Sequence, residues 1–158
     1  MVKKIGFSAY DKDEIISVTN NFSIDCVQLP LSLLDQRLAQ NEFLPWLKSQ
    51  NLEIEARSVF LQGALLMPTN QLPMCLAEAR NVIEKIKSDQ SKRGVSVLDA
   101  CIDFVKSIGC IDRMVVGVHS VQQLRQILEA NNKTLARFDY SAYAIDDEKI
   151  VNPTKWPS

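Results

Sequence analysis

The spacing of hydrophobic residues changes several times along this chain. Four short segments carry apolar residues in alternation or in short runs, which predicts β-strands, and turn residues or helical patterns bound each of them. These segments are residues 4–8, 24–31, 53–60 and 113–119. Between them apolar residues recur every three or four positions, which predicts amphipathic helices. Strand and helix alternate four times, a pattern typical of parallel βα units.

Polar residues mark the beginnings of the predicted helices. Asp11 or Asp13 precedes the first, Ser96 precedes the fourth with an acidic residue three positions later, and Ser120 precedes the last. Gly109 follows the fourth helix at a position typical of a C-cap. The apolar faces of these helices fall within residues 14–22, 38–47, 76–86, 97–105 and 124–128, and a polar run at 87–93 follows the third.

The last twenty residues or so, from Asp139, depart from this alternation. They contain Pro153 and Pro157, and we expect Trp156 to pack against the body of the protein, since a lone terminal tryptophan would otherwise be exposed. No linker or low-complexity tract divides the chain, which therefore reads as a single domain over residues 1–158.

Two architectures fit four βα units. A four-stranded parallel sheet with helices on both faces is a complete doubly wound domain. If all helices lie on one side, the sheet curls, and eight such units close a (β/α)8 barrel. The strands around Val27 and Val115 are apolar enough to be covered on both faces. Composition does not separate the two architectures.

Charge and composition exclude several classes of function. Of 158 residues, 46% are apolar, and the formal net charge is -1, which gives no electrostatic basis for binding nucleic acid. No apolar run approaches the ~20 residues that span a bilayer, so we expect no membrane association. The four cysteines form no C-x-x-C pair and the only histidine is His119, so we expect no metal site. Cysteines in apolar segments without a signal peptide point to the cytoplasm.

Five segments resemble bacterial aldo/keto reductases. IEARSVFLQGALL, residues 54–66, resembles the seventh strand of that family and the loop after it, particularly in members reading "RSVFLQG". IGFS is similar to the fifth strand, IDCVQLPLSLLD to the sixth, DRMVVGVHSVQQL to the eighth, and NPTKWP to the tail. The matches run in order over nearly the whole chain. The resemblance implies the C-terminal half of a (β/α)8 TIM barrel, with four parallel βα units, an extra helix and a C-terminal tail.

The resemblance also implies an NAD(P)-dependent oxidoreductase whose cofactor, NADPH or NADH, binds at the carboxyl ends of the strands. Ser8 and Gln28 stand where relatives hydrogen-bond the nicotinamide carboxamide, and Arg57 stands where many place a stacking Tyr. Ser8 as a helix cap and Gln28 in an internal hydrogen bond are the alternative readings. The implied pyrophosphate loop and adenosine-phosphate segment comprise Leu61, Gln62, Gly63, Gly117, Ser120, Gln123 and Leu124.

Three of these positions have alternative readings or depart from the family pattern. Gly63 and Gly117 also suit simple turns. Ser120 replaces an Arg that commonly holds the 2'-phosphate, so the resemblance does not choose between NADP and NAD. His119, at a strand end, reads as a capping or packing residue.

No catalytic residue is expected in this chain. The resemblance places the Tyr, Lys, Asp and His of the family's active site on strands before the fifth, which these 158 residues do not include. We therefore expect a half-barrel fragment that is inactive alone and binds a dinucleotide weakly. The alternatives are a noncatalytic binding module and an enzyme that forms when two half-barrels pair.

A half-barrel leaves two strand edges unpaired, and such edges promote pairing with another chain. The missing N-terminal half or a second copy in a homodimer would cover them. Interior positions are expected at Phe7, Val27, Leu29, Val59 and Val116, or at their neighbours one residue along. These side chains would lack the opposite wall of the barrel, and leaving several of them in water forfeits ~1.5–3 kcal/mol each, which favours association.

Overall fold

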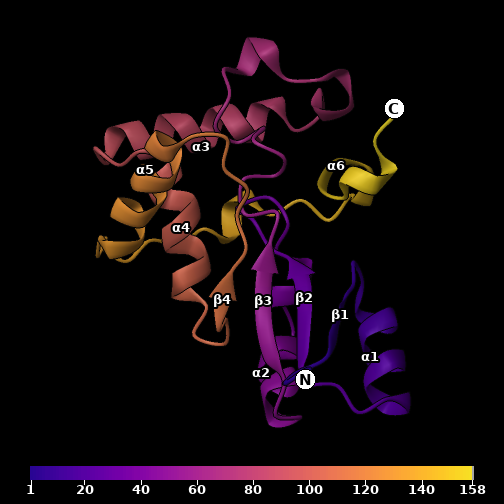
Figure 1. Cartoon of the computed structure of the whole chain (residues 1–158). Coiled ribbons are helices and arrows are strands. Elements are labelled where there is room, and N and C mark those ends of the chain that lie inside the picture. The colour runs from indigo at the N-terminus through magenta and orange to yellow at the C-terminus, as the bar shows by residue number, and fades with distance from the viewer. Residues whose placement is uncertain (158) are drawn as a thin grey trace.

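A computed structural model describes residues 1–157 (Figure 1). Its strands are β1 (Gly6–Ser8), β2 (Cys26–Pro30), β3 (Glu53–Arg57) and β4 (Arg113–Met114). Its α-helices are α1 (Lys12–Asn21), α2 (Phe43–Ser49), α3 (Arg80–Lys92), α4 (Val97–Ser107), α5 (Val121–Asn132) and α6 (Glu148–Val151). Short 3-10 turns lie at Arg37–Ala39, Thr69–Gln71, Met74–Leu76, Ser141–Tyr143 and Pro153–Lys155.

The four strands form one parallel sheet in the order β1-β2-β3-β4. A doubly wound sheet reverses its order at a switch point, whereas consecutive right-handed crossovers in an unbroken order place every helix on the same face. This order confirms the half-barrel expectation and excludes the doubly wound alternative. In Figure 1, α1 lies beside β1 at one edge of the sheet, and α4 and α5 lie beside β4 at the other.

The register gives the two faces of the sheet opposite character. Phe7, Val27 and Ile54 are partners across β1, β2 and β3, and the last two are fully buried. Leu29 and Ala56 continue this apolar row, which packs against the helices. The helices therefore cover one face, and that face holds the core.

The face that would line the barrel is polar. Ser8, Gln28 and Glu55 are partners across the sheet, and Arg113 follows on β4. Arg113 pairs with Glu53 at 2.8 Å and with Glu55 at 3.3 Å. The prediction that Phe7, Val27 and Leu29 face the barrel interior is therefore wrong, because these side chains face the helices. The alternative prediction, that their neighbours one residue along face the interior, is correct, since β-strand side chains alternate between faces.

The third and fourth strands are shorter than the sequence pattern predicts. β3 ends at Arg57 because Ser58 turns into the left-handed region with φ of 59°. β4 pairs with β3 at only two positions, Arg113 with Glu55 and Met114 with Ala56, plus a hydrogen bond from the Val115 N–H to the Ala56 carbonyl at 2.8 Å. Beyond residue 115 the apolar sequence forms no further strand hydrogen bonds. β4 is the edge strand of the sheet, and within residues 1–157 no strand lies on the side of β4 away from β3.

The helix caps largely follow the sequence. The side chains of Asp11, Ser96 and Ser120 accept hydrogen bonds from the N–H groups of the third following residues, which confirms Ser96 and Ser120 as N-caps and selects Asp11 over Asp13. The third predicted helix is misplaced: it begins at Arg80 and continues through the polar run to Lys92. That run continues the amphipathic helix, with most of its polar side chains toward solvent, while Gln90 is buried on the apolar side and donates to the Tyr143 hydroxyl at 3.3 Å.

The tail folds back over the loop that follows β2. Ile145 donates its N–H to the Leu34 carbonyl at 2.8 Å, and Gln36 donates its side-chain amide to the Tyr140 carbonyl at 2.9 Å. Tyr143 is fully buried. Trp156 is half-buried and donates its indole N–H to the Ile150 carbonyl at 3.0 Å, so it packs against the body as expected.

A charge cluster joins the tail to the same loop. Arg37 pairs with Asp35 at 2.8 Å and with Glu148 at 3.0 Å. Burial raises the pKa of the Asp35 carboxyl, while the hydrogen bonds and charge of Arg37 act in the opposite direction. The cluster therefore places α6 above the carboxyl ends of the strands (Figure 1).

Two absences apply to the described part of the chain. Residues 1–157 contain no helix that is both long and apolar enough to span a membrane. Nor do they bring together three or more side chains of the types that bind metals.

Candidate functional site

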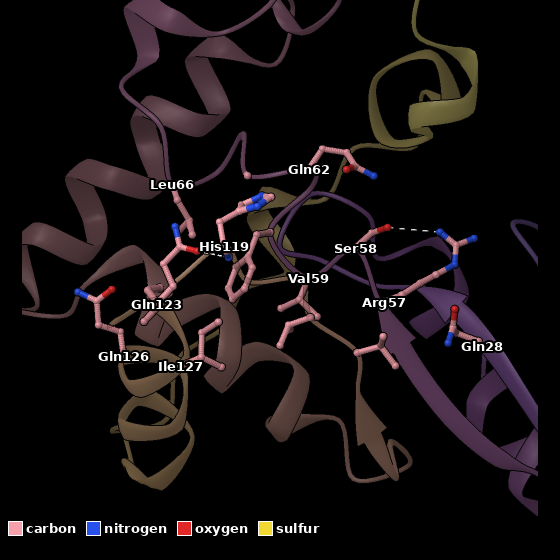
Figure 2. Close-up of a pocket in the computed structure, with 16 residues that line it drawn as sticks. Gln28, Arg57, Ser58, Val59, Gln62, Leu66, His119, Gln123, Gln126 and Ile127 are labelled. Atoms are coloured by element: carbon pink, nitrogen blue, oxygen red, sulfur yellow. Dashed lines mark hydrogen bonds between the residues drawn. The ribbon is translucent and has the colours of Figure 1, made fainter. Parts of the chain in front are cut away.

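A cavity of about 570 Å³ opens at the carboxyl ends of β3 and β4 and reaches the first turn of α5 (Figure 2). Parallel sheets bind ligands at this end, where loops and helix N-termini converge. Its lining comprises Gln28, Arg57, Ser58, Val59, Phe60, Gln62, Gly63, Leu66, Leu98, Val115, Val116, Gly117, His119, Gln123, Gln126 and Ile127.

The loop after β3 forms one wall in an unusual backbone conformation. Ser58, Leu61, Gln62 and Gly63 all have positive φ, between 46° and 84°. Non-glycine residues adopt this region at a cost of ~1 kcal/mol or more each, so a run of them marks a constrained loop. The backbone N–H groups of Phe60, Gln62 and Gly63 make no hydrogen bond within residues 1–157. Unpaired N–H groups in such a loop favour an anion.

Gln28 and Ser8 lie on the polar face of the sheet, beside the cavity. The Gln28 amide donates to Glu55 Oε2 at 3.1 Å, which leaves its own carbonyl oxygen free. The Ser8 hydroxyl accepts from Arg57 Nε at 3.1 Å and keeps its proton to donate. Together they present one acceptor and one donor, the pair that a carboxamide requires.

Arg57 is held from several sides. Its guanidinium carbon lies 4.0 Å from the centre of the Tyr10 ring, a cation–π contact. It also donates to the Ala9 carbonyl and to the Ser58 hydroxyl, each at 3.3 Å. The side chain is thereby fixed as a flat positive group at the edge of the cavity.

The segment from β4 to α5 forms the opposite wall. Ser120 accepts from the Gln123 N–H at 3.1 Å and caps α5, while the Gln123 side chain accepts from the His119 N–H at 2.8 Å. These paired contacts form a reciprocal cap that holds His119 and Gln123 at the rim, as Figure 2 shows. The His119 ring itself faces the cavity rather than the core.

The structure brings together six of the ten residues selected from sequence: Gln28, Arg57, Gln62, Gly63, Gly117 and Gln123. Ser8 lies next to them through its bond to Arg57. Ser120 acts as the cap of α5, and Leu124 lies outside the cavity. Leu61 is fully buried, so only its backbone is available to a ligand.

Sequence reasoning selected no apolar residue of the walls. Val59 and Phe60 directly precede the loop residues selected from sequence, Leu66 follows them, and Leu98 comes from α4. Apolar side chains carry no distinctive signal, because the same residues also suit a core. Gln126 and Ile127 were within reach, since they follow Gln123 on the same face of α5 at helical spacing.

The lining of the cavity carries one positive charge and no carboxylate. Arg57 is the only permanently charged side chain among its lining residues within the described part of the chain. The nearest carboxylate on the sheet, Glu55, is already bound by Gln28 and Arg113. A constrained loop with free N–H groups, one cation and no lining carboxylate fits a phosphate-bearing ligand.

No acid–base pair adjoins the cavity. Tyr10 is the phenol nearest to Arg57, yet no hydrogen bond from residues 1–157 reaches its hydroxyl. His119 is the one imidazole at the cavity, and no hydrogen bond within residues 1–157 joins its ring to an acidic or basic side chain. The residues described here can bind and orient a ligand, and they place no hydrogen-bonded acid–base pair beside it.

Comparison with known proteins identifies the relatives of this chain. The sequence model of the Aldo/keto reductase family matches residues 1–146. Among curated proteins, none matches the sequence. The holo form of aldo-keto reductase AKR11C1 from Bacillus halodurans superimposes with a TM-score of 0.67 at 16% identity, over 84% of this chain and 45% of that one.

Other solved structures agree. A thermostable aldo-keto reductase in complex with the inhibitor epalrestat has a TM-score of 0.59 at 13% identity. The match covers 93% of this chain and 46% of the reductase chain. The glycerol dehydrogenase from Gluconobacter oxydans has a TM-score of 0.51 at 14% identity, over 86% of this chain and 52% of its own. The present chain thus spans about half the length of the structures that it matches.

Proposed function

Because the chain belongs to the aldo/keto reductase family, we propose that it is the dinucleotide-binding half of an NAD(P)-dependent oxidoreductase barrel, inactive toward carbonyl compounds by itself. The observation that carries this proposal is the constrained loop at residues 58–63. Its free N–H groups lie beside a cavity whose walls come from β3, β4 and α5. A pyrophosphate is the anion whose size suits such a loop in a dinucleotide site.

The proposed contacts to the nicotinamide follow from the polar face of the sheet. The free carbonyl oxygen of Gln28 would accept from the carboxamide, and the Ser8 hydroxyl would donate to it. Arg57, which is fixed over the Tyr10 ring, would lie flat against one face of the nicotinamide ring. When bound, the dinucleotide would supply the hydride chemistry, and these side chains would only hold and orient it.

The phosphate and adenosine would lie along the rim between Gly117 and Gln123. Ser120 is committed to capping α5, so no basic residue there is placed to hold a 2'-phosphate. We therefore propose either NADPH or NADH as the ligand, bound weakly. Half a site buries only part of a dinucleotide, while the ordering costs of binding remain.

We also propose that the protein works in the cytoplasm. All four cysteines are free, and burial raises the pKa of the Cys101 thiol well above its usual range, which keeps it protonated and unreactive. Unpaired thiols of this kind suit a reducing compartment.

A binding measurement tests the site. NADPH fluorescence titration of the 158-residue protein should give a weak, saturable signal, and Gln28→Ala should weaken it by ~1 kcal/mol, about fivefold, for one neutral hydrogen bond. Gln71→Ala is the matched control, because this exposed glutamine lies in a turn away from the cavity lining. NADPH binding tighter than micromolar that ignores both Gln28→Ala and Ser8→Ala would contradict the proposed site.

A further inference from the structure

The two lateral edges of the half-barrel carry apolar groups at matching heights. Beside β4 lies a groove of about 520 Å³, here called the β4 groove. Its apolar lining comprises Ile102, Val105, Ile111, Met114, Val116, Ile127 and Leu128. Leu128 is 54% exposed although it projects from a helix whose other apolar side packs on α4.

The opposite edge carries a projecting aromatic side chain. Phe22 ends α1 as its C-cap and is 67% exposed. Ile5, just before β1, is also exposed. The residues that flank Phe22, Asn21 and Ser23, are uncharged. Phe22 and Ile5 are thus two exposed apolar residues beside the free edge of β1, and no other part of residues 1–157 covers them.

Phe22 lies at the amino end of the sheet, and the β4 groove extends from that end along β4 to Val116. The β4 groove is bounded by Arg113, where β4 begins, and by Lys106 and Asn131, where α4 and α5 end. Phe22 lies where α1 ends, just before β2 begins. In parallel βα units every helix runs back to the amino end of the strands, so Phe22 is level with the part of the groove near Arg113 and Asn131.

The rim of the β4 groove favours a neutral apolar occupant. Arg113 is bound by Glu53 and Glu55, and Asp112 is bound by Lys48. Lys106 donates to the carbonyls of Asn131 and Lys133. The charges around the opening are therefore already paired, and an ionic ligand would gain little there. An aromatic ring fits this chemistry.

We propose that two copies of this chain form a twofold dimer in which Phe22 of each inserts into the β4 groove of the other. The twofold axis would run along the barrel axis. The β4 edge of one copy would then pair in parallel with the β1 edge of its partner, and the eight strands would close a ring. Each copy carries one projecting ring and one groove that reaches the same height, so the same contact forms twice and leaves neither unused. The polar, internally paired face of each sheet would line the interior.

Closure of the ring would also pair the free backbone groups at the two sheet edges. β1 and β4 each present unpaired backbone groups along one side within residues 1–157, and such edges template strand addition. Pairing between β4 and the partner's β1 satisfies both at once. The dimer therefore removes two free edges and two exposed aromatic rings per pair of chains, without leaving an open end for further growth.

Sedimentation velocity over a wide range of concentration tests the dimer. The 158-residue protein should show a monomer–dimer equilibrium. Phe22→Asp should raise the dimer dissociation constant about a hundredfold, since each lost contact is worth ~tenfold and occurs twice. Leu128→Asp should raise the dimer dissociation constant by a similar factor. Met74→Asp is the matched control, because Met74 is 87% exposed and lies in a turn outside both edges; it should leave the constant unchanged. Circular dichroism checks that each variant is folded.

A charge exchange identifies the contact itself. Phe22→Asp and Leu128→Lys should each dimerise poorly alone. Mixed, they should form a heterodimer, because one interface then has an Asp facing a Lys and the other keeps the natural pair. A concentration-independent monomer that unfolds cooperatively would overturn the proposal. So would a dimer indifferent to both substitutions, or a chain that stays monomeric and instead binds a separately produced N-terminal half-barrel of an aldo/keto reductase.

Discussion

At the scale of single residues, the closest constraint on the sheet is at Gly6. A Cβ added there would overlap both the carbonyl oxygen and the Sγ of Cys26, its partner on β2. The thiol could rotate away, but the carbonyl belongs to the β1–β2 ladder and cannot. Gly6 is therefore required for the close approach of two strands, and its φ plays no part in this.

Replacing Gly6 should test that constraint. Gly6→Ala is expected to lower the free energy of unfolding by ~1–3 kcal/mol, the usual cost of overpacking. Gly109→Ala, where a Cβ would meet nothing, serves as the control in the same urea titrations. Adding Cys26→Ala to Gly6→Ala should restore only part of the loss; complete recovery would show that the thiol, and not the backbone, sets the spacing.

At the scale of elements, Asp112 ties three of them together where β4 begins. Both of its oxygens accept from Lys48 of α2, at 2.8 and 2.9 Å, and Oδ2 also accepts from the Ile54 N–H of β3 at 2.7 Å. Partial burial raises the pKa of the Asp112 carboxyl, but the bonds from Lys48 and Ile54 outweigh it, and the net pKa is lowered. The carboxylate therefore stabilises the fold in its charged form.

That contribution should depend on pH in a definite direction. The folded pKa of Asp112 is lower than the unfolded one, about 3.9, so the stabilisation is complete above the unfolded pKa and disappears as pH falls through the folded pKa. Asp112→Asn should cost ~1 kcal/mol at neutral pH, a figure discounted for solvent screening, and much less in strong acid. Asp146→Asn, at an exposed aspartate outside these contacts, is the control; equal losses at both ends of the pH range would refute the assignment.

At the scale of the whole molecule, the half-barrel contains the ligand cavity, whereas the family resemblance places the catalytic Tyr, Lys, Asp and His on strands before the fifth. The described residues build a ligand cavity with His119 at its rim, yet within residues 1–157 no side-chain hydrogen bond links His119 or Tyr10 to an acid–base partner. General acid catalysis is worth ~10²–10⁴-fold, and a second copy in the proposed dimer would bring only the same side chains. The half-barrel is therefore expected to bind without reducing.

An assay for NADPH oxidation with a simple aldehyde measures this directly. The purified 158-residue protein should give no turnover above background, in samples whose NADPH binding has been verified by fluorescence so that lack of cofactor is not the cause. Tyr10→Phe is the informative variant. Turnover in the parent protein that disappears in Tyr10→Phe would assign an acid role to Tyr10 and overturn the expectation.

Local physics made part of this protein predictable. Helix caps at Asp11, Ser96 and Ser120 depend on side chains within three residues, and all three were readable in the sequence. The same holds for the alternation of βα units. The polar Gln28 within the second strand and Gly63 in the loop after the third were likewise readable, and both line the cavity.

Other features depend on contacts between distant segments, which only the tertiary structure decides. Strand order chose the half-barrel over the doubly wound sheet, because both use the same local pattern. The register decided which residues face the open side: Gln28 and Glu55 rather than Val27 and Leu29. A shift of one residue exchanges the two faces of a strand, and only pairing with its neighbours and packing against helices determines which one prevails.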